Sequence, residues 1–573
     1  MEKPRIGIYV CWCGNNIAKM VDVVNVAKEL AELPNVIVSK DYKYMCSDPG
    51  QETVVNDIKD FKLNRIVVSA CSPRIHELTF RNTLRKAGLN PYMLQMSNIR
   101  EHASWVHTDK DITTIKAKDL ITASVKRINY HHPLEERLVD INPATMVIGG
   151  GVTGITSALE IADAGKKVYL IEKSDKLGGH TANISLTFPY LNSAQTKIKS
   201  LIKRVLNNKN INLFLETEID DITGYIGNFE TIIQQKDNTE TTVQFGNIIL
   251  AVGLKAWDPK PLENYGYGKL PDVITSVEFE QMLLSGKIKK KDGTVPKNIA
   301  IIHCVGSRNM DYNQYCSRTC CSIALKYANQ LRSAIPDSNI YELYADMRTM
   351  SKGCEELYSL TSRKKVMFLM FDQENDLPKI RKVSGKDKGD MIISLNELRT
   401  RKELEVPADM VILMVSMASQ DSSKKVSHAA GVSLDANKFF LEKHPKLDPV
   451  ATTTGGVYIV GSCQGPKGIP DSISQAMAAS ARILGVINSG KASVEVTTAF
   501  VNEPLCVGCK MCVSCCPYTA IVFDEERNFS YVNEVLCQGC GTCVALCRPK
   551  AINIKGCSHE QIMAELNGLL LTE

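Results

Sequence analysis

The sequence has no run of about 18 apolar residues and no apolar leader after its first residues, so we expect neither a membrane-spanning helix nor an export signal. It also has no long basic run. The formal net charge of +5 is spread along 573 residues, which is too weak to indicate nucleic acid or a membrane surface as a partner. We therefore expect a cytoplasmic protein with no nucleic-acid partner and no membrane insertion.

Cysteine, by contrast, is abundant, with 20 residues in the chain. In a reducing compartment, cysteines serve more often as metal ligands or redox centres than as disulfides. The hydrophobic content of 44% and the charged content of 23% are ordinary for a globular protein. The length is enough for about three or four domains, so the spacing of the cysteines within each domain is the first guide to function.

The first 130 residues alternate short apolar runs with stretches of helical spacing. This alternation predicts a parallel sheet with helices on its faces, hence an N-terminal α/β domain at residues 1–135. The expected strands are Ile6–Val10, Val36–Tyr44, Arg65–Ala70 and Tyr92–Met96. His131–Asn142 contains Pro133 and is interpreted as a linker.

A second α/β unit carries a glycine loop between a strand at Thr145–Ile148 and a helix at Ile155–Asp163. Its G-x-G-x-x-G pattern lies before Glu172, which ends the next strand. Such glycines let the backbone approach a pyrophosphate at a helix N-terminus, and an acidic residue at this spacing accepts hydrogen bonds from the ribose. We expect FAD here; the alternative is a dinucleotide fold that has lost its ligand.

Three later segments resemble other elements of FAD-binding reductases, namely Leu177–His180, Ile248–Gly253 and Gly456–Gly461. An aspartate usually follows the last of these strands, but Ser462 and Cys463 stand there instead, which leaves the contact to the ribityl chain open. The expected FAD-binding residues are Gly149, Gly151, Gly154, Glu172, Lys173, Gly178, Gly179, His180, Ala251, Gly253, Gly461, Gln464 and Gly465.

The FAD-binding domain is expected at 143–295 and 416–495, with a degenerate NAD(P)-like domain at 296–415 nested inside it. This nesting resembles thioredoxin and glutathione reductases. Lys297–Ile302 is the strand that should precede a nucleotide loop, but His303–Arg308 lacks the glycine pattern. The loop supplies thiols instead, and we expect them to bind a [4Fe–4S] cluster; the alternatives are a redox dithiol and inert buried cysteines. The four thiols are Cys304, Cys316, Cys320 and Cys321.

The tail, residues 500–556, repeats the C-x2-C-x2-C-x3-C spacing of two-cluster bacterial ferredoxins, in which the fourth cysteine of each run binds the other cluster. A pair of zinc sites is the alternative, although zinc sites usually use two C-x2-C pairs. Cluster one is assigned to Cys506, Cys509, Cys512 and Cys547, and cluster two to Cys537, Cys540, Cys543 and Cys516. Cys515 stays unassigned, and residues 557–573 are expected to form a C-terminal helix.

Four more cysteines follow the ends of the first three expected strands. Because the carboxyl ends of parallel strands meet at one crevice, these thiols could bind a further cluster; separate buried cysteines are the alternative. The set is Cys11, Cys13, Cys46 and Cys71. His76, Arg100 and His102 nearby are interpreted as structural groups or partner contacts, and Cys354 and Cys557 as non-ligands.

Taken together, the motifs resemble the A-type subunit family of heterodisulfide reductases over almost the whole chain. The strings that carry the resemblance are Tyr9–Gly14, Tyr44–Gly50, Ala70–Arg74, Thr187–Pro189, Cys304–Arg308, Tyr315–Cys321 and Cys463–Pro466. The resemblance implies a cluster at the Cys304 set close to a flavin that splits or merges electron pairs. It implies B-type and C-type partner subunits and a small electron-delivery subunit with hydrogenase or dehydrogenase modules, and it leaves ferredoxin and a homodimer open.

Two departures from the family matter. Many members carry a second ferredoxin module inserted in the FAD-binding domain, whereas this chain runs from Gly227 through Lys236 to Ile248 without one. Many also carry a cysteine pair after the Thr-Phe-Pro string, where this chain has Ser193 and Thr196. One usual exit for electrons is therefore missing, and bifurcation to ferredoxin does not follow from the resemblance.

The sequence thus predicts an α/β flavoprotein oxidoreductase with a ferredoxin-like α+β tail, acting inside a multisubunit complex of an anaerobe. No acid–base pair or nucleophile for substrate chemistry stands out, because in such enzymes the cofactor carries the hard step. Two alternatives remain: a self-contained NAD(P)H-dependent flavin reductase, and a relay scaffold whose flavin is structural.

Overall fold

The computed structural model describes residues 2–234, 239–383, 390–494 and 496–570. It divides into two compact units, which are treated separately: Met1–Val139 with Ser493–Glu573, and Asp140–Ala492. Within the described ranges, no helix has the length and apolar character that a membrane crossing requires.

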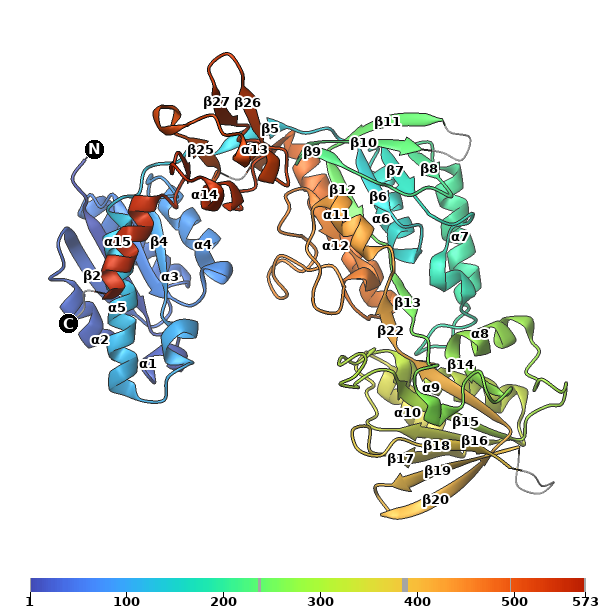
Figure 1. The fold of residues 1–573 in the computed structure, drawn as a ribbon. Coiled ribbons are helices and arrows are strands. Elements are labelled where there is room, and N and C mark those ends of the chain that lie inside the picture. Colours follow the sequence, from blue (N-terminus) through green and yellow to red (C-terminus); the bar gives the residue numbers. More distant parts are fainter. Residues whose placement is uncertain (1, 235–238, 384–389, 495, 571–573) are drawn as a thin grey trace. The chain divides into compact units, whose positions relative to one another are not determined.

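The first unit opens with a four-stranded, all-parallel sheet, as the alternating pattern predicts (Figure 1). In order of pairing the strands are β2 (Val36–Tyr42), β1 (Ile6–Cys11), β3 (Arg65–Ala70) and β4 (Leu94–Asn98). One face packs against α2 (Val23–Leu30) and α5 (Lys110–Ile128), and the other against α3 (Asp48–Asp60) and α4 (Pro73–Lys86). Because β1 and β3 are covered on both faces, both read as continuous apolar runs.

The ferredoxin-like tail belongs to the same unit. It consists of two antiparallel strand pairs and one short helix for each cysteine run. The pairs are β25 (Ala499–Val501) with β28 (Ile552–Ile554) and β26 (Ile521–Asp524) with β27 (Phe529–Val532), and the helices are α13 (Met511–Cys515) and α14 (Thr542–Leu546). Cysteines make up much of its small core, so bound metal has to supply stability that apolar packing does not.

The expected C-terminal helix is α15 (His559–Leu570), and it packs along α5 of the N-terminal domain. Gly568 lies against the backbone of Ala123, where a side chain would collide. Arg127 ties the two helices together, because its guanidinium pairs with Glu565 at 2.6 Å. The stretch expected to be a linker also contains a short strand, β5 (Arg137–Asp140).

The second unit begins with a five-stranded parallel sheet, which contains the strands expected around the glycine loop. Its strands are, in order of pairing, β23 (Val457–Ile459), β12 (Asn247–Leu250), β6 (Thr145–Ile148), β7 (Val168–Ile171) and β8 (Ile211–Phe214). One face is covered by α6 (Val152–Asp163), α7 (Ala194–Asn207) and α12 (Ile469–Ser489). The other face is covered by β10 (Asn228–Gln234), β11 (Glu240–Phe245) and α11 (Ser423–Ala430). Lys236, between β10 and β11, lies outside the described residues.

A second parallel sheet forms the nested domain. This domain begins before residue 295, the boundary expected from the sequence. Its strands are β14 (Val273–Thr275), β21 (Met410–Val415), β15 (Asn298–Val305), β16 (Asn339–Tyr344) and β17 (Val366–Met370). Because β14 pairs with β21, the stretch before residue 295 joins this domain rather than the FAD-binding one. The chain crosses between the two sheets at an antiparallel pair, β13 (Leu254–Ala256) with β22 (Met417–Ser419). Helices α8 (Ser276–Ser285) and α9 (Cys320–Ala334) cover one face of the second sheet, and β19 (Met391–Glu397) and β20 (Lys402–Ala408) the other.

Candidate redox centre

A cavity of about 1400 Å³ lies within the second unit. Its walls come from the glycine loop after β6, the end of β7, the segment before α7, the start of α12, and α8 and α9 of the nested domain. A volume above the roughly 300–1,000 Å³ of ordinary small-molecule pockets suits a dinucleotide.

The three glycines of the loop differ in the atoms that surround them. The difference is the one expected for a loop that binds a pyrophosphate. A Cβ on Gly149 would collide with the carbonyl of Ala251, and a Cβ on Gly154 with the carbonyl of Gly149. A Cβ on Gly151 would meet no protein atom within 4 Å, and Gly151 lines the cavity at the N-terminus of α6. The first and third glycines therefore permit close packing, while the second leaves open space for phosphate beside helix N–H groups.

Glu172 lies in the cavity wall at the end of β7, as the sequence predicts, and is 9% exposed. One carboxylate oxygen accepts the Gly150 N–H at 2.6 Å, and the other accepts the Ser174 N–H at 2.8 Å. The second oxygen also accepts the Ser174 hydroxyl at 2.8 Å. These bonds fix the carboxylate on the loop, and the oxygen bonded to Gly150 keeps a lone pair for a ribose hydroxyl.

The other expected FAD-binding residues fall into two groups. One group lines the cavity, and the other does not. The lining residues are Gly149, Gly151, Glu172, Lys173, Gly179, His180, Ala251 and Gly253. The remaining residues are Gly154, Gly178, Gly461, Gln464 and Gly465; among them, the Gly178 N–H donates to the Gly150 carbonyl at 2.8 Å.

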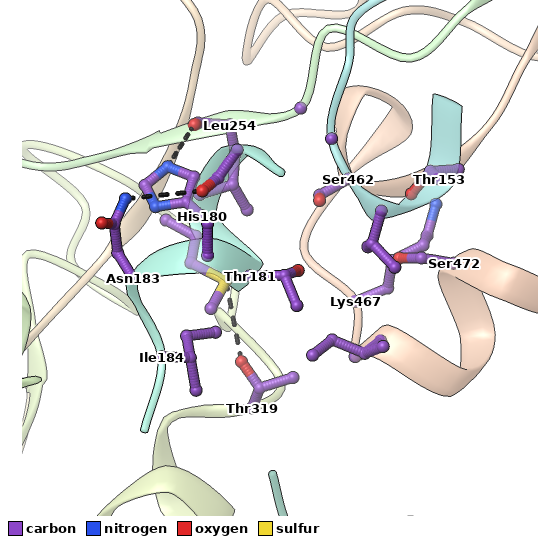
Figure 2. A pocket seen from close by; sticks show the side chains of 18 of the residues that line it. Thr153, His180, Thr181, Asn183, Ile184, Leu254, Thr319, Ser462, Lys467 and Ser472 are labelled. Atoms are coloured by element: carbon purple, nitrogen blue, oxygen red, sulfur yellow. Dashed lines mark hydrogen bonds between the residues drawn. The ribbon is translucent and has the colours of Figure 1, made fainter. Parts of the chain in front are cut away.

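Two opposite walls of the cavity are visible in Figure 2. His180 and Asn183 lie on one wall, where a ring nitrogen of His180 bonds the Leu254 carbonyl at 2.8 Å. Ser462 and Lys467 lie on the other, close to the start of α12. Ser462 thus occupies the wall where the expected aspartate would stand, so a hydroxyl replaces a carboxylate there.

Lys467 is a cavity residue that the sequence motifs do not reveal. Its ammonium donates to the Gly461 carbonyl and to the Gln464 side-chain oxygen, both at 2.9 Å. Burial lowers the pKa of Lys467 to about 8, and Arg318 opposes its charge further. The only sequence hint is a lysine placed just before the Gly-Ile-Pro start of α12.

We expect the FAD affinity of the apoprotein to fall as pH rises above about 8, the pKa of Lys467. The anionic pyrophosphate favours the charged ammonium, so binding takes up a proton and weakens once the lysine is neutral. The affinity of Lys467→Met should change much less between about pH 7 and about pH 9.5. FAD fluorescence titrations across that range measure both, and parallel pH profiles would contradict the expectation.

Three of the four thiols expected in the nested domain lie together. Cys304 lies near the end of β15 with a left-handed φ of 57°, while Cys320 and Cys321 begin α9. Hydrogen bonds from the Cys320 thiol lower the pKa of Cys304 and of Cys321, while the pKa of Cys320 itself is raised. Thiolates at a helix N-terminus are the form that binds metal.

Cys316, the fourth member of this set, lies at the start of the loop that leads into α9. Its sulfur accepts the Arg318 N–H at 3.3 Å. Arg318, Thr319 and Ser322 all line the cavity. The loop that carries the thiols is therefore also part of the cavity wall.

The four N-terminal thiols meet at the carboxyl edge of the first sheet, as strand order predicts. Burial raises the pKa of Cys71 to about 11, and the Cys13 and Cys11 thiols raise it further. Burial also raises the pKa of Cys46, to which Cys13 adds. Arg100 donates to the Cys13 sulfur at 3.5 Å, so its cation can offset the charge of the grouped thiolates.

In the tail, the four sulfurs assigned to cluster two interact with one another and with Cys515. Burial raises the pKa of Cys543 to about 12, and Cys537, Cys515, Cys540 and Cys516 raise it further. The backbone N–H of Ala520 donates to the Cys516 sulfur at 3.3 Å, the kind of hydrogen bond that tunes an iron–sulfur centre.

The ligands assigned to cluster one come from both runs. Cys512 lies in α13 and Cys547 directly after α14, and these two short helices pack against each other. Cys506 and Cys509 precede α13. Cys515, which the spacing leaves unassigned, interacts electrostatically with thiols of both sets and so lies between them.

Over the described ranges, no three His, Cys, Asp or Glu side chains converge where a single metal ion could sit.

Ser193 and Thr196 stand at the positions where many members of the family that this chain resembles carry a cysteine pair. Ser193 caps α7, accepting the Thr196 N–H at 3.3 Å, and the two hydroxyls are bonded at 3.2 Å. The site thus keeps a helix cap built of hydroxyls rather than of thiolates.

Comparisons with known families and proteins agree with this geometry. Residues 143–302 match the pyridine nucleotide-disulphide oxidoreductase family, and residues 498–548 match the 4Fe-4S dicluster domain. The parallel sheets and these two matches establish a flavoprotein α/β core with a ferredoxin-like tail.

Relatives align over nearly the full chain. An A-type iron–sulfur subunit of the CoB–CoM heterodisulfide reductase of Methanopyrus kandleri is 36% identical over 92% of this chain and 92% of its own. The A-type subunit of the H2:CoB–CoM heterodisulfide,ferredoxin reductase of Methanothermobacter thermautotrophicus is 36% identical over 92% and 91%. A thioredoxin reductase structure from T. acidophilum covers 61% of this chain and 100% of its own at 15% identity, with a TM-score of 0.41.

Proposed function

The chain belongs to the family of A-type subunits of heterodisulfide reductase, and from this premise we propose that it passes electrons between partner subunits through one FAD and four [4Fe–4S] clusters. It is an oxidoreductase that holds FAD and [4Fe–4S] clusters. The proposal concerns the number of clusters, their ligands and the route. The proposed ligand sets are one in the N-terminal domain, one in the nested domain, where three of the four thiols lie together, and two in the tail.

One observation carries the proposal: the cysteine loop of the nested domain forms part of the flavin cavity wall. Thr319 lines the cavity, and Cys320 follows it directly. In a reductase of this architecture the nested domain delivers electrons from a nicotinamide. Here thiols occupy the same end of β15, so an electron can pass between a cluster and the flavin across a thin wall.

The residues of the second site also argue against a bound nicotinamide nucleotide. The loop after β15 lacks the glycine pattern, and Gly306 packs against the ring of Trp257, which fills the space that a Cβ would take. Trp257 packs in turn against Tyr312, with ring centroids 5.0 Å apart. Aromatic side chains thus cover the position where a pyrophosphate would need open backbone.

When bound, FAD supplies the exchange between two-electron and one-electron steps, and the clusters supply one-electron carriers. The protein's part is to hold and tune them. Gly151 and the N-terminus of α6 receive the pyrophosphate, Glu172 fixes the ribose, and Lys467 places a cation in the flavin cavity. Arg100 provides a compensating charge at the N-terminal set.

We propose three kinds of partner: B-type subunits, C-type subunits, and a small subunit that delivers electrons. Ferredoxin is a further acceptor in this proposal. Ser193 and Thr196 cannot serve as thiolate ligands, so the exit that the family's cysteine pair provides is closed in this chain. Three routes stay open for ferredoxin: bifurcation through the tail module, bifurcation through a separate partner, or no bifurcation at all.

The purified full chain should contain about sixteen irons and one FAD, because each [4Fe–4S] cluster holds four irons. Its visible spectrum should be unchanged by NADH and bleached by dithionite. Anaerobic iron, sulfide and flavin assays with the spectrum measure these values. About eight irons would leave only the tail clusters. Prompt bleaching of the flavin by NADH would instead favour the NAD(P)H-dependent reductase. A flavin that no reductant reduces in the assembled complex would favour the relay scaffold.

A further inference from the structure

A buried histidine–glutamate pair lies beside the thiols of the nested domain. His303 and Glu342 are both 0% exposed, and His303 Nε2 lies 3.1 Å from a Glu342 carboxylate oxygen. They sit on adjacent strands, β15 and β16, which pair in parallel. Taking such a pair out of water is costly unless its remaining polar atoms are satisfied.

The remaining ring nitrogen, His303 Nδ1, has no hydrogen-bond partner among the described residues. Two observations show what it faces. Ile299 and Ile301 of β15 pack in the same core cluster as Cys320 and Cys321, so His303, two residues further, is on the same face of the strand. In addition to Cys320, His303 lowers the pKa of Cys321, so imidazole and thiol are neighbours.

From this geometry we infer that His303, held by Glu342, donates a hydrogen bond to the sulfur of Cys321 and thereby raises the reduction potential of the cluster in the nested domain. Glu342, as a carboxylate, accepts from Nε2 and stabilises the doubly protonated imidazolium, whose second N–H, on Nδ1, is then directed toward the sulfur. Both are positioning residues, because they act through the thiolate ligand. The inference rests on the proposed cluster at Cys304, Cys316, Cys320 and Cys321.

The direction of the effect follows from charge. One-electron reduction adds negative charge to the cluster and its thiolates, and an N–H donor stabilises that charge more in the reduced state. Hydrogen bonds to the sulfurs are among the main determinants of cluster potential. The consequence for function is that this cluster, next to the flavin, is biased toward accepting an electron.

The test replaces the whole pair, His303→Leu with Glu342→Leu, in the full chain. Exchanging a buried ion pair for apolar side chains is often neutral for stability, whereas removing one partner leaves an unpaired buried charge. The cluster's signal is first identified as the one that Cys320→Ala removes from the EPR spectrum. We expect the equilibrium constant for its reduction to fall about tenfold, which is about 59 mV lower for one electron.

A matched control changes a different buried polar pair, Asn329→Leu with Thr361→Val, whose side chains are bonded at 2.6 Å. Asn329 lies in α9, which Cys320 and Cys321 begin, but more than two helical turns further along, so the potential of the cluster in this variant should match wild type. An unchanged or raised potential in the histidine–glutamate variant would overturn the inference alone. If Cys320→Ala removes no signal and no iron, the proposed cluster fails, and the inference fails with it.

Discussion

Replacing Gly151 by alanine is expected to lower FAD affinity by roughly ten- to a hundredfold, since a misplaced methyl group costs about 1–3 kcal/mol. The stability of the apoprotein should not change. The reason is the open space around Gly151: a methyl group there meets no protein atom within 4 Å, but it occupies the approach to the pyrophosphate. Equilibrium FAD titration and thermal unfolding of the apoprotein measure the two quantities.

Two other glycine variants serve as comparisons for Gly151→Ala. Gly154→Ala forces a methyl group onto the Gly149 carbonyl, so it should reduce both FAD affinity and apoprotein stability, the latter by about 1–3 kcal/mol. Gly485→Ala lies within α12 with no atom within 4 Å of the added Cβ and should keep FAD affinity. Loss of apoprotein stability in Gly151→Ala, or normal FAD affinity, would show that this loop does not hold the pyrophosphate as described.

Cys516→Ala is expected to remove cluster two, although Cys516 belongs to the first cysteine run. The loss should be about four irons, because the Cys516 sulfur groups with those of Cys537, Cys540 and Cys543. The EPR spectrum of the remaining clusters should then match that of Cys537→Ala. Iron analysis and EPR of the dithionite-reduced protein measure both.

Cys515→Ala is the matched control, since Cys515 lies among the same thiols but is not assigned as a ligand. It should retain full iron. If Cys515→Ala loses iron while Cys516→Ala does not, the ligand assignment must be exchanged. If the spectrum of Cys516→Ala instead matches that of Cys506→Ala, each run binds its own cluster and the crossed pattern is wrong.

The strands and the FAD loop were predictable because they depend on local pattern. Arg65–Ala70 and Thr145–Ile148 are strands with the expected bounds, since continuous apolar runs mark strands buried on both faces. The G-x-G-x-x-G spacing is likewise a local signal, because it determines the conformation of its own loop. The meeting of Cys11, Cys13, Cys46 and Cys71 followed from strand order alone.

Features that depend on contacts between distant segments were not predictable. The domain boundary near residue 295 was misplaced because β14 is three residues long and is recognisable only through its pairing with β21. Lys467 and Trp257 carry no motif. The role of Lys467 follows from its place in the cavity wall, and that of Trp257 from its packing against Gly306. His303 reads in sequence as one polar residue in an apolar strand, and only the neighbouring β16 supplies Glu342 as its partner.

The packing of α15 on α5 has a consequence for how the chain is made. Gln561 of α15 bonds Tyr130, just beyond α5, although the two residues are 431 positions apart in the chain. At about 5–20 residues per second, a ribosome needs tens of seconds to cover that distance. During this time the nascent N-terminal domain exposes the groove that its last helix will fill, and its grouped thiols are already present. The N-terminal sheet and the helix that packs along α5 are therefore made at separate times, because 431 positions separate Tyr130 from Gln561.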